Sequence, residues 1–131
     1  MLFIDQKKLL WENMNHSNYL PEFKKEFDQL LKKFRSLNDD IKIFERFIFE
    51  NPTGFGKNFV TMYSDENVKI VKARILCKSL RNRNIRIIYA YHNDRFEFMY
   101  IEIYFKGDKE NEDRERIKEY LSSLRKNHDS K

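Results

Sequence analysis

The chain has 131 residues and a formal net charge of +5, enough sequence for one domain with a hydrophobic core. Hydrophobic residues make up 40% of it and aromatic residues 15%, which excludes intrinsic disorder. No apolar run reaches the ~20 residues that a membrane-spanning helix needs, and charges interrupt the N-terminal stretch. With Cys77 as the single cysteine, we expect one cytoplasmic domain over residues 1–131, without a signal peptide or a disulfide.

The first half of the chain predicts a helical hairpin. Pro21 suits the first turn of a helix, and five apolar side chains then recur on one stripe: Phe23, Phe27, Leu30, Leu31 and Phe34. Ser36 and Asn38 are candidate caps of a second helix, which Asn51-Pro52 ends. Both helices are amphipathic, so their apolar faces should pack against a common core.

Two other segments carry weaker signals. Leu2–Ile4 has the pattern of a short strand and Leu9–Met14 that of a helical turn. Gly54-Phe55-Gly56-Lys57 contains glycines and a lysine, as phosphate-binding loops do, but it lacks their glycine spacing and the Ser or Thr after the lysine. We interpret this segment as a plain loop.

The second half of the chain alternates like a sheet. The β-branched and aromatic residues gather in four runs: Phe59–Tyr63, Val68–Leu76, Ile85–Tyr91 and Phe96–Phe105. A final helix is predicted over Asp108–Lys131, capped by Asp108 or Asn111, with an apolar stripe of Ile117, Tyr120, Leu121 and Leu124. The expected fold is α+β: an N-terminal helical hairpin packed on a three- to four-stranded antiparallel sheet, followed by a C-terminal helix.

The positive charge is concentrated in the predicted sheet. Residues 67–95 contain eight Lys or Arg and a single acid, Asp94, whereas the segments on both sides have slightly more acids than bases. Such segregation indicates a surface that binds a polyanion, RNA or DNA.

Strand alternation selects a candidate site within this basic region. It places Lys72 and Arg74 on the sheet face opposite the helical hairpin, while their neighbours should face the hairpin. If the strands are adjacent, Arg86, Tyr104 and Lys106 can join them. Each residue also has a simpler interpretation: solvated lysine and arginine on an open sheet face, and a tyrosine in the core.

The register of the last hairpin decides whether Arg86 joins this site. A two-residue turn at Asn93-Asp94 would place Arg86 opposite Ile101 and on the wrong face. A bulge or a three-residue loop would place Arg86 on the face of Glu102, where an Arg86–Glu102 ion pair is the alternative role.

These residues resemble a known protein family. FKKEFDQLLKKF in the first helix and the stretch from Lys72 to Ile117 are similar to the RelE/ParE superfamily of small bacterial toxins. The matching parts are a basic strand, an Arg-hydrophobic-hydrophobic-Tyr strand, and a hydrophobic strand ending in a basic turn: Lys72-Ala73-Arg74, Arg86-Ile87-Ile88-Tyr89 and Ile101–Lys106. RelE-like members cleave mRNA on the ribosome, and ParE-like members poison DNA gyrase.

The resemblance implies residue roles and partners. Lys72, Arg74, Arg86 and Lys106 would surround the scissile phosphate, and further RNA contacts would come from Lys78, Arg81, Arg83, Arg95 and Lys109. The family's C-terminal tyrosine is missing after Lys106, so Tyr104 or Tyr120 would substitute, or the general base differs. The implied partners are a cognate antitoxin protein, mRNA and the ribosome.

The residues permit cleavage without a cofactor or a metal. The three histidines are far apart in the sequence and Cys77 is alone, so ligand spacing for zinc is missing. The 2′-hydroxyl would attack the adjacent phosphate, with Lys72 as the base, Arg74 and Arg86 stabilising charge, and Lys106 protonating the leaving oxygen. The alternatives are a gyrase-poisoning toxin and a non-catalytic RNA- or partner-binding homologue.

Overall fold

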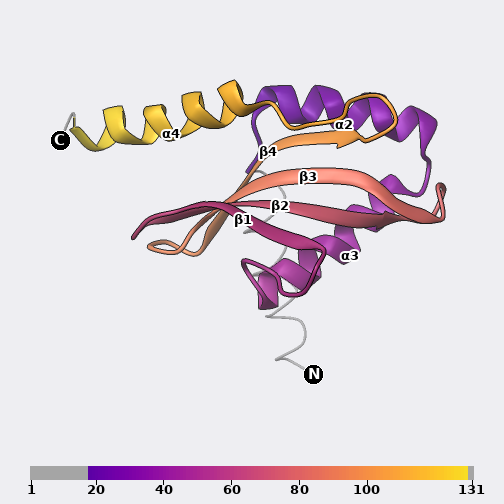
Figure 1. Ribbon diagram of the computed structural model, residues 1–131, viewed down its shortest axis with the longest axis horizontal. Coiled ribbons are helices and arrows are strands. Elements are labelled where there is room, and N and C mark those ends of the chain that lie inside the picture. The colour runs from indigo at the N-terminus through magenta and orange to yellow at the C-terminus, as the bar shows by residue number, and fades with distance from the viewer. Residues whose placement is uncertain (1–17, 130–131) are drawn as a thin grey trace, which may run out of the picture.

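The computed structural model describes residues 18–129, with side chains to residue 125, and places four antiparallel strands in one sheet (Figure 1). The strands neighbour one another in chain order: β1 (Phe59–Ser64), β2 (Val68–Cys77), β3 (Asn82–His92) and β4 (Glu97–Phe105). Helices α2 (Pro21–Lys33) and α3 (Leu37–Glu50) precede them, and α4 (Arg114–Asp129) follows. The predicted α+β arrangement is confirmed. The signals at Leu2–Ile4 and Leu9–Met14 lie outside the described residues.

Helices α2 and α3 cover one face of the sheet. The main hydrophobic core lies between these two helices and the sheet. The sheet contributes Val71, Ala73 and Ile75 to it, as strand alternation predicted. Aromatic rings join the layers: Phe23 stacks on Tyr100 with ring centroids 5.1 Å apart. Burying side chains of this size stabilises the fold by roughly 1.5–3 kcal/mol each, which makes this layer the main source of cohesion. Cys77 is buried here, as expected of an inert thiol.

A smaller apolar cluster lies on the other face, under α4. Ile117 and Tyr120 of α4 are buried against Val68, Ile70 and Ile88, and Leu121 and Leu124 pack at its margin. The predicted stripe of the last helix is therefore confirmed. α4 covers only part of this face, so it does not cover Lys72 and Arg74, which lie further along β2. Within the described residues, no helix is long and apolar enough to cross a membrane.

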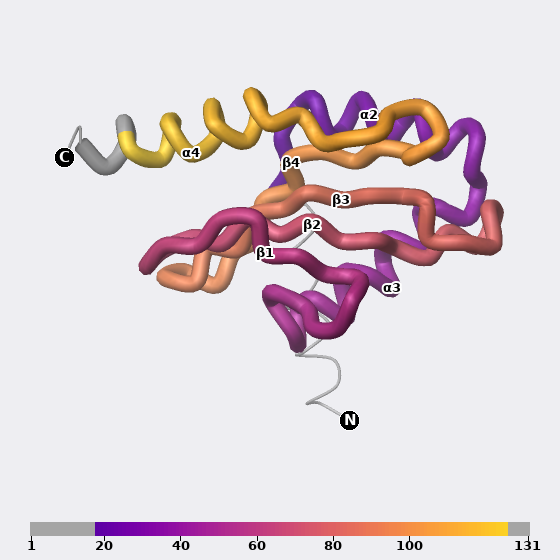
Figure 2. The backbone as a smooth tube through the Cα atoms, viewed as in Figure 1, coloured from indigo at the N-terminus to yellow at the C-terminus, as the bar shows by residue number. Residues whose placement is uncertain are grey.

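The last helix begins later than predicted. Residues 106–113 are not helical; they turn back along β4 before α4 starts at Arg114 (Figure 2). Glu102, fully buried on β4, holds this segment: it accepts hydrogen bonds from Lys109 Nζ and from the Asp113 backbone N–H, the latter at 2.8 Å. Because these contacts hold residues 106–113 against β4, the helix begins only at Arg114. Neither Asp108 nor Asn111 therefore caps α4.

The β3–β4 hairpin differs from both loops considered in the sequence. His92 pairs with Glu97, so the connection is the four residues 93–96, and Phe96 has a positive φ of 55°. A bulge between Ile88 and Tyr89 then shifts the register by one residue. A bulge was one of the two features that would bring Arg86 to the candidate site, and this bulge places Arg86 opposite Tyr104.

Candidate nucleic-acid interface

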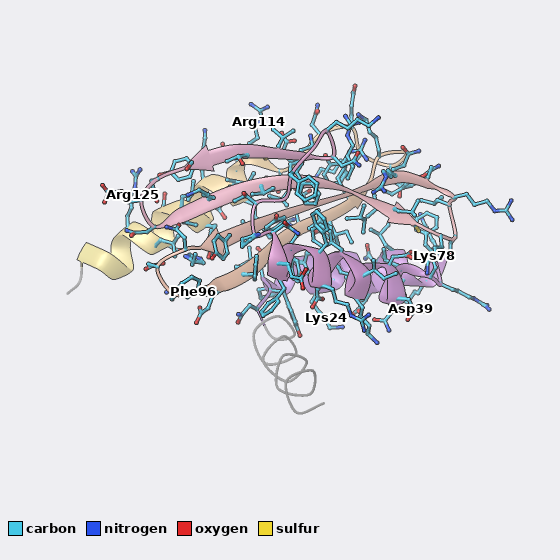
Figure 3. All side chains as sticks on the ribbon, turned by 90° about the horizontal axis from the view of Figure 1, so that it is seen from below. Lys24, Asp39, Lys78, Phe96, Arg114 and Arg125 are labelled. Atoms are coloured by element: carbon cyan, nitrogen blue, oxygen red, sulfur yellow. The ribbon has the colours of Figure 1, made fainter. Side chains whose placement is uncertain are left out.

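A groove of about 540 Å³ lies on the α4 side of the sheet, between β1, β2 and the first turns of α4. Its apolar wall includes Val60, Met62 and Ile117. Its charged lining comprises one carboxylate, Glu112, and five cations: Lys57, Lys72, Arg74, Arg114 and Lys118. In Figure 3, Arg114 projects on the side of the sheet opposite Lys24 and Asp39, which lie on the helical side. Such a groove, with net positive charge and apolar walls, suits a nucleic-acid strand.

Lys72 in this groove is neutralised by the chain itself. Its Nζ donates to Glu112 Oε1 at 2.7 Å, and the second oxygen of Glu112 accepts from Arg114 Nε at 3.1 Å. Burial would lower the pKa of Lys72, but the Glu112 hydrogen bond and the nearby Tyr104 hydroxyl raise it above its ordinary value. Lys72 is therefore protonated at neutral pH, and its predicted role as a general base loses its physical basis.

Arg74 lines the groove, whereas Arg86 is buried next to it and is not part of the lining. They are direct partners across β2 and β3, so both guanidinium groups lie on the α4 side of the sheet. Arg86 is 5% exposed, and the hydrogen bond found for its side chain goes to the Arg83 carbonyl oxygen. Burial, and then the charge of Arg74, lower the pKa of Arg86. No carboxylate among the described residues pairs with either guanidinium.

The suggested Arg86–Glu102 ion pair is absent because Glu102 is engaged elsewhere. Glu102 faces Ile88 in the register, and its partners are Lys109 and the Asp113 backbone. The alternative structural role for Arg86 is therefore wrong.

Tyr104 lies next to Arg86 across β3 and β4, but it is buried, and no group in the described part of the chain hydrogen-bonds to its hydroxyl. Lys109 Nζ lies 5.7 Å from the centre of its ring. Burial raises the pKa of Tyr104, with Lys72 opposing the shift, so the phenol stays protonated at neutral pH. It can donate a hydrogen bond to an anion, and it is unsuited to accept a proton.

The other candidate tyrosine is also occupied. The Tyr120 hydroxyl is hydrogen-bonded to Nε2 of His92, and both side chains are buried. Burial raises the pKa of Tyr120 to about 12. Tyr120 thus fastens α4 to the end of β3 and does not line the groove.

The remaining predicted residues are spread over the molecule. Lys106 is exposed directly after β4, where its N–H donates to the Asn84 carbonyl oxygen. Lys78 and Arg81 lie in the β2–β3 turn, and Arg83 is part of β3. Arg95 lies in the β3–β4 turn at the other end of β3, paired with Glu97 at 3.1 Å. Lys109 is committed to Glu102. These five predicted RNA contacts (Lys78, Arg81, Arg83, Arg95 and Lys109) do not form one surface.

The structure adds residues that sequence reasoning missed. Lys57, Arg114 and Lys118 line the groove, and Glu112 occupies its floor beside Lys72. The first three come from a loop and from α4, and nothing in the local pattern relates them to β2. Glu112 stands in an acid-rich run in which no residue is distinguished by its neighbours.

Comparisons with models of protein families, with curated proteins and with solved structures find no match to this chain. The described residues also contain no group of three or more His, Cys, Asp or Glu side chains placed to hold a metal ion.

Proposed function

We propose that this protein binds single-stranded RNA along the basic groove and is a toxin of a type II toxin–antitoxin system that cleaves mRNA. The observation that carries the proposal is the Arg74–Arg86 pair. Two like charges directly opposite each other on neighbouring strands destabilise a sheet, and burying one of them adds a desolvation cost. A phosphate between the two guanidiniums offsets both costs, since each can form forked hydrogen bonds to phosphate oxygens.

The proposed cleavage uses the RNA's own nucleophile. The 2′-oxygen attacks the adjacent phosphorus, and its proton passes to a water molecule because Lys72 and the tyrosines stay protonated. The bond to the 5′-oxygen breaks and this oxygen takes a proton from water, which gives a 2′,3′-cyclic phosphate and a 5′-hydroxyl. Arg74 and Arg86 stabilise the extra charge of the pentavalent transition state, each by about 3 kcal/mol. The buried Tyr104 hydroxyl, which lacks a partner, is a further donor next to Arg86.

A second function is favoured by the Lys72–Glu112 ion pair. A lysine that is neutralised within the chain, together with phenols that stay protonated, supports a non-catalytic RNA-binding homologue on the same fold. The two functions share the Arg74–Arg86 phosphate site and differ in turnover.

One experiment separates these functions. The full chain is expressed in bacteria, beside an Arg74→Ala, Arg86→Ala variant and an Arg35→Ala control, and growth, transcript ends and gyrase–DNA complexes are measured. Binding of the three purified proteins to single-stranded RNA is measured in parallel. Growth arrest with transcripts ending in cyclic phosphate, lost in the double variant, supports the nuclease. RNA binding without cleavage supports the non-catalytic homologue. Trapped gyrase with intact mRNA points to the gyrase-poisoning class, and absence of RNA binding overturns both proposals.

The cognate antitoxin remains part of this proposal. A small acidic partner that lays a helix or an extended segment across Lys72, Arg74 and Arg86 would neutralise the two arginines and compete with Glu112 for Lys72. Co-expression of the neighbouring gene should then relieve the growth arrest, while the protein's intrinsic RNA affinity returns once the partner is removed.

A further inference from the structure

A second cavity, of about 220 Å³, lies on the helical side of the molecule, on the opposite face of the sheet from the groove. It is lined by residues of α2, α3 and β4 and by Tyr19 just before α2. Its walls are mainly aromatic and apolar: Tyr19, Phe23, Phe27, Ile41 and Tyr100.

Two residues that line this cavity each carry a buried polar atom without a partner among the described residues. Glu45 is 5% exposed, and no described group hydrogen-bonds to its Oε2; Tyr100 is 2% exposed, and the same holds for its hydroxyl. Leaving a buried polar group unpaired costs about as much as a lost hydrogen bond, so such groups are rare in folded proteins. Two of them lining one cavity indicate that a further group completes the site.

The chemistry of the lining selects the kind of group. A carboxylate oxygen accepts hydrogen bonds and attracts positive charge, and a phenol oxygen can also accept. Aromatic rings attract a cation to their faces, and carboxylates with aromatic walls are the usual surroundings of bound ammonium ions. We propose that this cavity binds a small organic ammonium ion, with Glu45 as its counter-ion and the rings of Phe23 and Tyr100 as part of its walls.

The described cations near the cavity do not fill this role. Lys24 lines the cavity, but its Nζ is held by both carboxylate oxygens of Asp28, at 2.7 and 2.8 Å. Lys42, the neighbour of Glu45 on α3, is exposed and makes no ion pair with it among the described residues. Among the described residues, no cation is left to pair with Glu45, and the proposal takes it from a ligand.

The titration of Glu45 makes the proposal testable without a variant. Burial raises the pKa of Glu45 to about 8, with Lys42 opposing the shift. The other titratable groups of the cavity are Lys24, Tyr19 and Tyr100, and burial holds the pKa of Tyr100 well above its ordinary value. A cation binds the ionised carboxylate, so affinity should rise about tenfold per pH unit up to about pH 8 and then level off. Binding should also release a proton below that pH.

The probe is tetramethylammonium chloride, titrated into the full chain at pH 6, 7, 8 and 9 at constant ionic strength and followed by NMR, with tert-butanol as the neutral probe of similar shape. We expect saturation at pH 9 with a Kd on the order of 1 mM. Glu45→Gln should weaken binding at least about tenfold, and Asp39→Asn, an exposed change on the same helix, should leave it unchanged. Proton release by the wild type provides the same test if Glu45→Gln fails to fold.

Three results would overturn the proposal. One is the absence of saturable binding at pH 9, which would leave water as the partner of both orphaned oxygens. Another is equal affinity for tert-butanol, which would show that the cavity selects shape and not charge. The third is binding that is independent of pH and unaffected by Glu45→Gln. None of these results bears on RNA binding, because the groove lies on the other face of the sheet.

Discussion

Glu112 Oε1 accepts a hydrogen bond from Lys72 Nζ at 2.7 Å, although 40 positions separate the two residues. The Glu112 side chain is only 3% exposed and thus occupies the floor of the basic groove as a built-in anion. An RNA phosphate that approaches Lys72 is repelled by this carboxylate and competes with it for the ammonium group. The pair therefore sets how much of the positive charge of the groove is available to a ligand.

Glu112→Gln should strengthen RNA binding several-fold. The change removes a negative charge from the groove and frees Lys72, so one more phosphate can be neutralised and the slope of log affinity against log salt should steepen by about 0.7. Fluorescence anisotropy with a short single-stranded RNA at three salt concentrations measures both quantities. Glu110→Gln, an exposed change in the same segment, is the control. An unchanged salt slope would show that Lys72 does not contact phosphate.

Arg86→Met should leave the free energy of unfolding unchanged or raise it, by up to about 1–2 kcal/mol. The variant removes a buried charge that has no carboxylate partner and faces Arg74, and its side chain has a similar length. RNA affinity should fall about tenfold or more, the effect of losing a charged hydrogen bond. Urea unfolding and anisotropy on the same sample give both values, with Arg35→Met as the surface control.

The same residue allows a test of the register. Glu102 pairs with Lys109 and Asp113 and not with Arg86, so the destabilisation caused by Glu102→Gln should add to the effect of Arg86→Met within about 0.5 kcal/mol. A larger coupling energy in this double-mutant cycle would contradict the bulged register.

Arg116→Met should lower the free energy of unfolding by about 2–4 kcal/mol. Arg116 of α4 holds both carboxylate oxygens of Glu26 on α2, at 2.8 and 2.9 Å, and also donates to the Ile101 carbonyl oxygen at 2.9 Å. The Arg116 side chain is 13% exposed and that of Glu26 25%, so the variant leaves a partly buried carboxylate with only the Ile103 N–H as a donor among the described residues. Lys118→Met, an exposed position on the same helix, should change stability by less than about 0.5 kcal/mol. Similar losses in the two variants would contradict this role.

Stability should decline with pH through Glu45. The pKa of this carboxyl is about 8 in the folded protein against an ordinary value of 4.5, so the folded state holds one more proton between these values. The contribution is complete below about pH 4.5, falls by at most about 1.4 kcal/mol per pH unit above it, and is lost as pH rises through 8. Urea unfolding of wild type and Glu45→Gln at pH 5 to 8 measures it. A difference between the two proteins that does not vary with pH would contradict the raised pKa.

Phe96→Gly should raise the free energy of unfolding by about 0.5–1 kcal/mol. Phe96 has a φ of 55° in the β3–β4 turn and its side chain is 65% exposed, so it bears the cost of a left-handed backbone with little burial in return. Thermal unfolding measures the effect, with Phe55→Gly as an exposed control at another loop position. A loss of stability would mean that the Phe96 ring makes a contact worth more than the strain.

The sequence by itself determined the elements of this protein and the faces they present. The alternation in β2 assigned Val71 and Ala73 to the core under α2 and α3, and the helical spacing in α4 identified its buried stripe. These properties follow from local geometry, because side chains alternate along a strand and repeat about every 3.6 residues along a helix. The basic character of the sheet was likewise visible in the order of the residues.

Tertiary structure alone decided which polar groups meet. The β2–β3 register put Arg86 opposite Arg74, and a bulge in the β3–β4 pairing after Ile88 put Tyr104 opposite Arg86. The return of residues 106–113 along β4 gave Lys72 and Glu102 their partners. Long-range pairs of this kind depend on register and on the path of a connection, and a shift of one residue moves a side chain to the other face of a sheet. Local periodicity contains no information about register or about the path of a connection. The sequence therefore located the basic face but did not identify the partners of its charged residues.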